Sequence, residues 1–141
     1  MTDPTPATPR SLLAGSPAFT ILLSLDLEAS RHFYGDVLGL RLLRDDSTAL
    51  EARLVYEAGE GTRLVISRST VGTSDTQTQA AFRVPDIRAA VAELRALGVK
   101  IEDYVAPDHV TYDGVADIGH SWAAWFIDPH RNCLAIVQAK D

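Results

Sequence analysis

The chain is poor in cysteine: its 141 residues include only Cys133. A single cysteine excludes an intrachain disulfide and any metal site built from paired cysteines. It also suits a reducing compartment, so we expect a cytoplasmic protein. No apolar run approaches the roughly 20 residues that a membrane-spanning helix needs. The start also lacks the longer apolar stretch of a signal peptide, so we expect no membrane partner.

Basic charge is scarce as well. The formal net charge is −6, because 13 lysine and arginine residues stand against 19 aspartate and glutamate residues. Nucleic acids and anionic membranes are bound mainly through basic surfaces, so we expect neither as a partner. The hydrophobic fraction of 46% is ordinary for a folded domain. A neutral or cationic small molecule remains compatible with this balance.

Proline is concentrated at the start of the chain. Residues 1–17 contain four of the seven prolines and one short apolar run. This composition predicts a flexible tail. The remaining residues, 18–138, predict a single domain with a shared core.

The rest of the chain contains the same order of elements twice. In the first unit, FTILLSL predicts a strand, Asp26 caps a helix over LEASRHFYGDVL, and Gly39 ends that helix. In the second, AAFRV predicts a strand, Asp86 caps a helix over IRAAVAELRAL, and Gly98 ends it. Each helix precedes three predicted strands, at residues 40–44, 51–58 and 62–68, and then at 99–105, 121–127 and 133–138.

This repetition predicts an α+β fold made of two βαβββ modules, residues 18–68 and 79–138. One helix over a small sheet buries too little to be stable alone, so the modules should lie side by side with their helices outside. The concave mixed sheet between them is then the expected binding cleft.

Three stretches carry a family resemblance: DLEASRHFYGDVLGLRLL, FRVPDIRAAVAELRALGV and AAWFIDPHRNCLAIV. With them, residues 18–138 resemble the vicinal oxygen chelate superfamily, which groups glyoxalase I, bleomycin-resistance proteins and extradiol dioxygenases. The resemblance implies paired βαβββ modules. It says less about function, because this fold hosts both metalloenzymes and metal-free binders.

The resemblance also implies where a metal would lie. In the metalloenzymes of this family, four His, Glu or Gln side chains on cleft-facing strands hold one divalent ion. The matching positions here are Phe19, Val65, Gln79 and Ala135. Only Gln79 offers a donor atom, and one amide does not hold a catalytic ion. We therefore expect neither a metal site nor another cofactor.

Strand alternation predicts which side chains line the cleft. The expected lining is Phe19, Ile21, Leu23, Arg63, Val65, Ser67, Gln79, Ala81, Arg83, Ala123, Trp125, Cys133, Ala135 and Val137. The opposite set, under the helices, is Phe82, Val84, Phe126, Leu134 and Ile136. The candidate ligand-binding residues are Phe19, Leu23, Val65, Gln79, Arg83, His120, Trp125 and Ala135.

Several of these residues have a second interpretation. Trp125 is either a stacking platform for a flat ligand or a core residue. Arg83 either orients the ligand or pairs with an acid at the rim. His120 ends the long segment DHVTYDGVADIGH, which either forms a lid with an acid or base at the cleft mouth or simply makes turns.

Two functional hypotheses follow. The first is metal-independent binding of an aromatic or apolar small molecule, with sequestration of the drug-resistance type as its role. The second is an enzyme of the lyase, isomerase or dioxygenase type that uses non-standard cleft residues, with His120 as acid or base. We expect a homodimer in either case, because each module leaves edge strands to be covered and many relatives pair modules across two chains.

Overall fold

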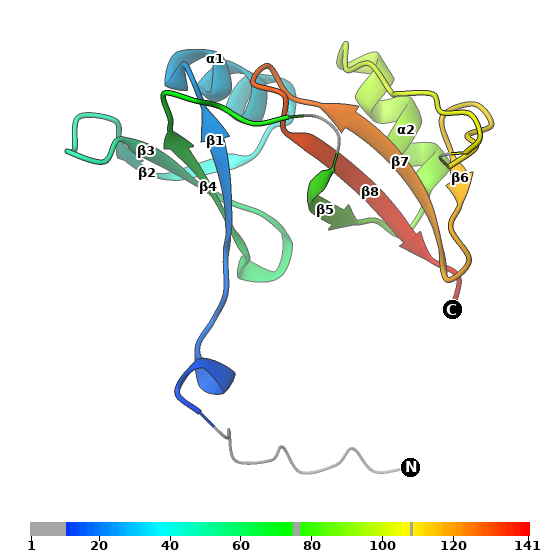
Figure 1. Cartoon of the computed structure of the whole chain (residues 1–141), viewed down its shortest axis with the longest axis horizontal. Coiled ribbons are helices and arrows are strands. Elements are labelled where there is room, and N and C mark those ends of the chain that lie inside the picture. Colours follow the sequence, from blue (N-terminus) through cyan, green and yellow to red (C-terminus); the bar gives the residue numbers. More distant parts are fainter. Residues whose placement is uncertain (1–10, 75–76, 108) are drawn as a thin grey trace.

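The computed structural model describes residues 11–74, 77–107 and 109–141. Within them, two four-stranded mixed sheets lie beside each other, with strand orders β1-β4-β3-β2 and β5-β8-β7-β6 (Figure 1). The elements are η1 (Leu13–Gly15), β1 (Thr20–Ser24), α1 (Leu27–Arg31), η2 (His32–Val37), β2 (Arg41–Asp46), β3 (Arg53–Glu57), η3 (Gly59–Gly61), β4 (Arg63–Arg68), β5 (Thr78–Arg83), α2 (Ile87–Ala96), β6 (Ala116–Asp117), β7 (Ser121–Ile127) and β8 (Cys133–Ala139). The expected α+β fold of two βαβββ modules is confirmed.

The two sheets are built by the same pairing rules. In each, the first strand pairs in parallel with the last, and the last three strands form an antiparallel meander. Ile21 lies opposite Val65 in the first module, and Ala81 lies opposite Ala135 in the second. The first module is therefore a structural counterpart of the second, with one difference at the parallel pair: the register shifts between Thr78 and Ala80 in β5 and is unbroken in β1.

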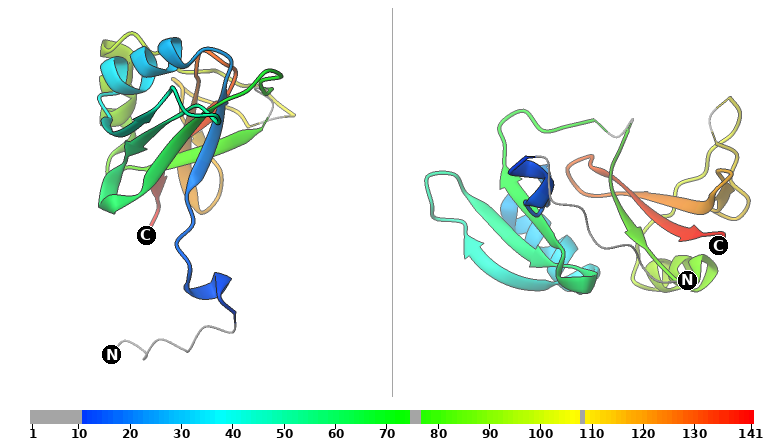
Figure 2. Two further views of the ribbon diagram at one scale, coloured as in Figure 1. Left: turned by 90° about the vertical axis from the view of Figure 1, so that its left-hand side faces the viewer. Right: turned by 90° about the horizontal axis from the view of Figure 1, so that it is seen from below.

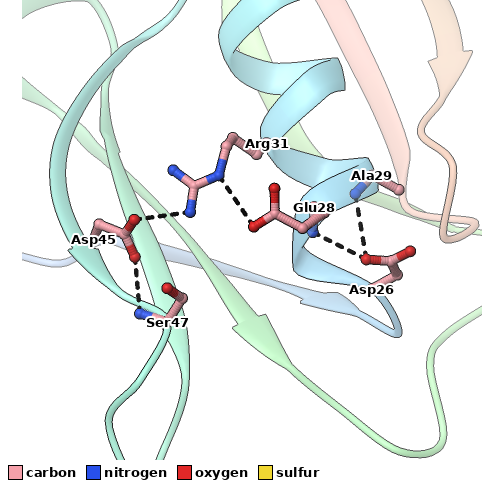
Figure 3. A network of polar contacts seen from close by, with 6 residues as sticks. All are labelled: Asp26, Glu28, Ala29, Arg31, Asp45 and Ser47. Atoms are coloured by element: carbon pink, nitrogen blue, oxygen red, sulfur yellow. Dashed lines mark hydrogen bonds and ion pairs between the residues drawn. The ribbon is translucent and has the colours of Figure 1, made fainter.

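Helix α1 begins at the predicted cap. The Asp26 carboxylate accepts the backbone N–H groups of Glu28 and Ala29, which have no partner inside the helix (Figure 3). The helix continues as the π-helical turn η2, and Gly39 follows it with φ of 73°. A glycine adopts this left-handed backbone without the strain of a Cβ, which explains why the helix ends there.

An ion pair fastens α1 to its own sheet. Arg31 Nη2 donates to Asp45 Oδ2 at 2.8 Å, and the Ser47 backbone N–H donates to the other carboxylate oxygen at 2.9 Å (Figure 3). Hydrogen bonds from Ser47 and from Arg31 lower the pKa of Asp45 from 3.8 to about 2. Because the folded chain favours the ionised form, this contribution to stability is complete above about pH 4 and is lost as the pH falls towards 2.

Helix α2 covers the second sheet. Asp86 caps it through the Ala89 N–H, and Ile87 and Val91 are its buried residues. Figure 2 shows both helices gathered on one side of the molecule, with the sheets on the other. Among the described residues, no helix is both long and apolar enough to cross a lipid bilayer.

One apolar core joins the modules behind the sheets. It contains Leu22, Leu54, Tyr56 and Ile66 from the first module and, from the second, the residues expected under the helices, including Phe126, Leu134 and Ile136. Phe33 of η2 packs against Phe126 across the joint, with ring centroids 6.3 Å apart. The shared core explains why neither module needs to be stable alone.

A buried polar cluster closes the same joint. Tyr34 donates to Asp128 Oδ2 at 2.6 Å, and Asn132 Nδ2 donates to the same oxygen at 2.7 Å. Asn132 Nδ2 also donates to the Leu23 carbonyl of β1 at 2.8 Å. Burial and the Asp128 carboxylate raise the pKa of Tyr34 far above its ordinary value, so its hydroxyl stays a donor. These bonds tie the 128–132 turn to the first module.

Two expectations need separate comment. The strand predicted at 99–105 is wrong: this segment makes one backbone bond to β7, from Glu102 N–H to the Trp125 carbonyl, and then turns away as Tyr104 bonds to Thr111. The short strand β6 takes its place. Of the predicted tail, residues 1–10 lie outside the described residues, and residues 11–17 are exposed.

Candidate functional site

Each sheet has a face turned away from its helix, which we call the cleft face. On the first sheet, side chains of this face alternate with core residues along β1, so Ile21 and Leu23 flank buried Leu22. On the second sheet, Ala123, Trp125, Cys133 and Ala135 form a cluster separate from the core under α2. The alternation predicted for these strands is therefore present, but the two cleft faces have different surroundings.

The cleft face of the second module is filled by its own chain. Trp125 is only 7% exposed, and Cys133 and Ala135 are each 3% exposed. Ala116, Tyr104 and Ile118, which come from the connection between α2 and β7, pack with this cluster. The long connection, for which a lid and simple turns were both open interpretations, thus lies against the sheet and covers it.

Trp125 is held from three sides. The His109 imidazole stacks on its ring with centroids 5.1 Å apart and planes 4° apart, and Tyr104 meets it edge-on at 5.5 Å. Its indole Nε1 donates to Thr78 Oγ1 at 3.0 Å. Stacking of a ligand on Trp125 therefore stays a prediction, and it would require displacement of the imidazole.

Gln79 occupies a β-bulge. Its neighbours in β5 are Thr78, opposite Cys133, and Ala80, opposite Leu134, so Gln79 is the extra residue. Its Oε1 accepts the Cys133 N–H at 3.0 Å, and its Nε2 donates to Thr73 Oγ1 at 3.0 Å. Both ends of the amide thus have partners within the chain. One partner is the backbone N–H of Cys133, which the bulge would otherwise leave without a hydrogen bond in the sheet.

The four family metal positions do not fit a resident metal ion. Phe19, Val65 and Ala135 carry no donor atom, and the amide of Gln79 is engaged in the bulge. Val65 and Ala135 are also buried, at 4% and 3% exposed. Among the described residues, no three His, Cys, Asp or Glu side chains gather closely enough to hold a metal.

The cleft face of the first module is open along β1, although Val65 on the neighbouring strand β4 is buried. Phe19 and Ile21 are 55% and 54% exposed, although both are large and apolar. Ile21 also lines a groove of about 710 Å³. Its lining is Ile21 and Leu23 of β1, Ser67 and Arg68 of β4, and residues 47–52 and 69–70.

Two further candidates lie at separate edges of the molecule. Arg83 is exposed at the end of β5 and lines another groove, of about 640 Å³, together with Arg63 and the 58–62 turn. His120 lies in the β6–β7 turn, where Nδ1 is 2.8 Å from Ser121 Oγ and its carbonyl accepts the Lys140 N–H. The eight candidates therefore do not converge on one cavity among those described.

The sequence did not point to the partners that cover Trp125. Tyr104 and His109 lie in an irregular connection, where no period assigns a side chain to a face. The bulge at Gln79 reverses the alternation by one residue, so Thr78 rather than Gln79 meets Trp125. The only signal for these contacts was the unusual length of the connection, because long loops often cover a site.

Comparison with solved structures confirms this architecture. A glyoxalase family protein from Enterococcus faecalis is 20% identical, with a TM-score of 0.64, and 86% of this chain covers 96% of that one. The fosfomycin resistance protein FosX from Listeria monocytogenes is 15% identical, with a TM-score of 0.65 and coverage of 86% and 88%. An integron cassette protein from the mobile metagenome of the Halifax Harbour sewage outfall is 20% identical, with a TM-score of 0.63 and coverage of 86% and 97%. At these identities the likeness shows the fold alone.

No curated protein matches this chain. A family model does: the one described as Glyoxalase/Bleomycin resistance protein/Dioxygenase superfamily matches residues 18–136, most of the chain. This agrees with the resemblance carried by the three motifs. The chain therefore belongs to the glyoxalase, bleomycin resistance protein and dioxygenase superfamily.

Proposed function

We propose that this protein binds a small, largely apolar organic molecule at its cleft faces, without a metal ion and without transforming it. The observation that carries the proposal is the state of the four family metal positions. Three offer no lone pair, and the fourth, Gln79, has both ends of its amide bonded within the chain. The shared chemistry of the metalloenzymes, chelation of a substrate by a Lewis-acidic ion, has no ligand set here.

The first module supplies the surface for the ligand. Ile21 and Leu23 line the 710 Å³ groove, and Phe19, directly before β1, adds further exposed apolar area. A groove of this size suits a drug-sized molecule. Removing such apolar area from water is worth about 25 cal/mol per Å², which makes binding favourable without any charge pair.

The second module supplies a fixed wall. Trp125, with Ala135 beside it, is packed rather than open, and a ligand that takes the place of the His109 imidazole would gain the same stacking. Arg83 lines the separate groove of about 640 Å³, so its guanidinium orients only a ligand that extends into that groove. In this proposal Val65 is packed within the first sheet and Gln79 bonds to β8, so both stabilise the sheets and do not contact the ligand.

The biological role that we propose is sequestration in the cytoplasm, of the drug-resistance type. FosX, which shares the fold, is a fosfomycin resistance protein, and the family description itself includes bleomycin resistance. The groove combines apolar side chains with hydroxyl groups and with Glu51 and Arg68, and the family metal positions hold no ligand set, so we propose retention of a compound rather than its conversion.

Screening tests the proposal. Thermal-shift and tryptophan-fluorescence measurements against aromatic natural products and drugs should give hits that mass analysis recovers unchanged. Leu23→Ala should weaken a hit, whereas Val71→Ala, at an 85% exposed apolar residue outside the groove, should not. Turnover of a hit that disappears in His120→Ala would overturn the proposal in favour of the enzyme.

We also propose that a second copy of the chain completes the cleft. β1 and β5 are each hydrogen-bonded on one side only, and the exposed Phe19 and Ile21 lie along one of these free edges. A homodimer covers such an edge with the same surface of a second copy. Light scattering at micromolar concentration should give twice the chain mass, and Ile21→Asp should give monomer. A monomer in the unaltered chain would contradict this part alone.

A further inference from the structure

A second cavity lies on the helix side of the sheets, away from both cleft faces. It has a volume of about 180 Å³ and is lined by ten residues. Leu38 and Leu40 come from the first module, and the other eight come from the second: six from β5, α2, β7 and β8, and Val84 and Leu97 directly after β5 and α2. Its floor includes Phe126 and Ile136, which are almost fully buried. The cavity therefore opens into the core that joins the modules.

The size and lining of this cavity select one kind of occupant. An apolar cavity of about 150 Å³ is known to hold a single benzene ring, so this one is large enough for an aromatic ring and little more. Nine of its ten lining residues are apolar. Leu97, which caps the C-terminus of α2, is 46% exposed and leaves a path to solvent.

Glu93 supplies the only charge in the lining of this cavity. Its side chain makes no ion pair or hydrogen bond to another residue in the part of the chain that the structure describes. Most arginines and lysines nearby in sequence have other partners: Arg88 and Arg95 pair with Asp113, and Lys100 pairs with Glu102. An unpaired carboxylate beside an apolar cavity attracts a cation and repels an anion.

We propose that this pocket binds a small hydrophobic cation: one aromatic ring in the apolar cavity and an ammonium group at Glu93. The ring gains apolar contact with residues of both modules, and the ammonium pairs with a carboxylate that is otherwise free. The net charge of −6 favours the approach of a cation. The site is independent of the cleft, because its residues face the helix side of the sheets.

Three probes of similar shape and different charge test the proposal: benzylammonium, benzyl alcohol and phenylacetate. Titrations followed by methyl NMR should shift signals of Leu94, Leu97 and Ile136. Exposed ion pairs contribute modestly, so benzylammonium should bind about three- to fivefold more tightly than benzyl alcohol, and phenylacetate more weakly than either.

Two variants separate the charge from the cavity. Glu93→Gln should remove the preference for benzylammonium and leave the affinity for benzyl alcohol unchanged, whereas Glu60→Gln, at an exposed acid elsewhere, should change neither. Ala90→Leu fills the cavity and should weaken all three probes. Equal binding of the three probes by the unaltered protein, a preference that survives in Glu93→Gln, or shifts at Ile21 and Leu23 instead would each overturn the proposal.

Discussion

The two modules share strand order, yet their cleft faces differ in what covers them. On the first, Val55 of β3 is partly exposed; on the second, its counterpart Trp125 of β7 is only 7% exposed. The cause is the connection between helix and second strand. It spans residues 38–40 in the first module and residues 97–115 in the second, where it folds over the sheet.

Two modules with the same fold therefore do not have the same exposed surface on their cleft faces. A sheet face is open or closed according to what the connections bring to it, and strand alternation reports only which side chains could be there. Stability should therefore depend on the cleft face of the second module, and binding on that of the first.

The largest effect is expected from Trp125→Ala. Truncation of a buried aromatic leaves a cavity and removes the bond to Thr78, so the free energy of unfolding should fall by about 3–5 kcal/mol. Chemical denaturation measures this change. A loss below about 1 kcal/mol would mean that the second cleft face is as open as the first.

A smaller loss is expected at the joint that both modules share. Tyr34→Phe removes a buried bond to the Asp128 carboxylate and should cost about 1.5–3 kcal/mol. Tyr56→Phe is the matched control, because the Tyr56 hydroxyl is buried without a hydrogen-bond partner among the described residues. That variant should be neutral or slightly stabilising in the same denaturation experiment. Equal losses in the two variants would show that the Tyr34 bond does not tie the modules together.

His109→Ala should uncover the second cleft face at modest cost. Loss of one stacked ring should lower the free energy of unfolding by about 0.5–1.5 kcal/mol. Acrylamide should then quench the fluorescence of Trp125 more strongly, with Trp122→Phe as background to leave one indole. Unchanged quenching would show that the imidazole does not shield the ring.

The smallest effect on stability is expected on the open face. Ile21→Ser should change the free energy of unfolding by no more than about 0.5 kcal/mol, because the side chain is already half exposed. The same variant should weaken a screening hit by about tenfold, since the ligand loses an apolar contact. If Ile21→Ser unfolds more easily but binds the hit normally, the cleft face of the first module contributes to stability and not to binding, which contradicts the account.

Much of the fold follows from local patterns in the sequence. Asp26 and Asp86 cap the helices as predicted, and β7 and β8 begin at Ser121 and Cys133. Caps and alternation are properties of a few neighbouring residues, so one sequence is enough to find them.

The surroundings of the site do not follow in this way. Residues 99–105 alternate like a strand, but only Glu102 bonds to β7 before the chain turns. Contact between His109 and Trp125 depends on the path of that whole connection. Likewise, the bulge at Gln79 moves Thr78 onto the cleft face, and no local pattern marks a single extra residue.

The central claim is that binding at the cleft needs no metal, and one titration tests it most directly. Calorimetry of a screening hit should be run on protein treated with a chelator and on protein supplied in turn with nickel, zinc, manganese and iron(II). We expect the same affinity in every case and no stoichiometric metal after dialysis, because the family positions hold Phe19, Val65, Gln79 and Ala135. Metal that survives dialysis in a one-to-one ratio, is lost in Gln79→Ala and is required for the hit to bind would contradict the account.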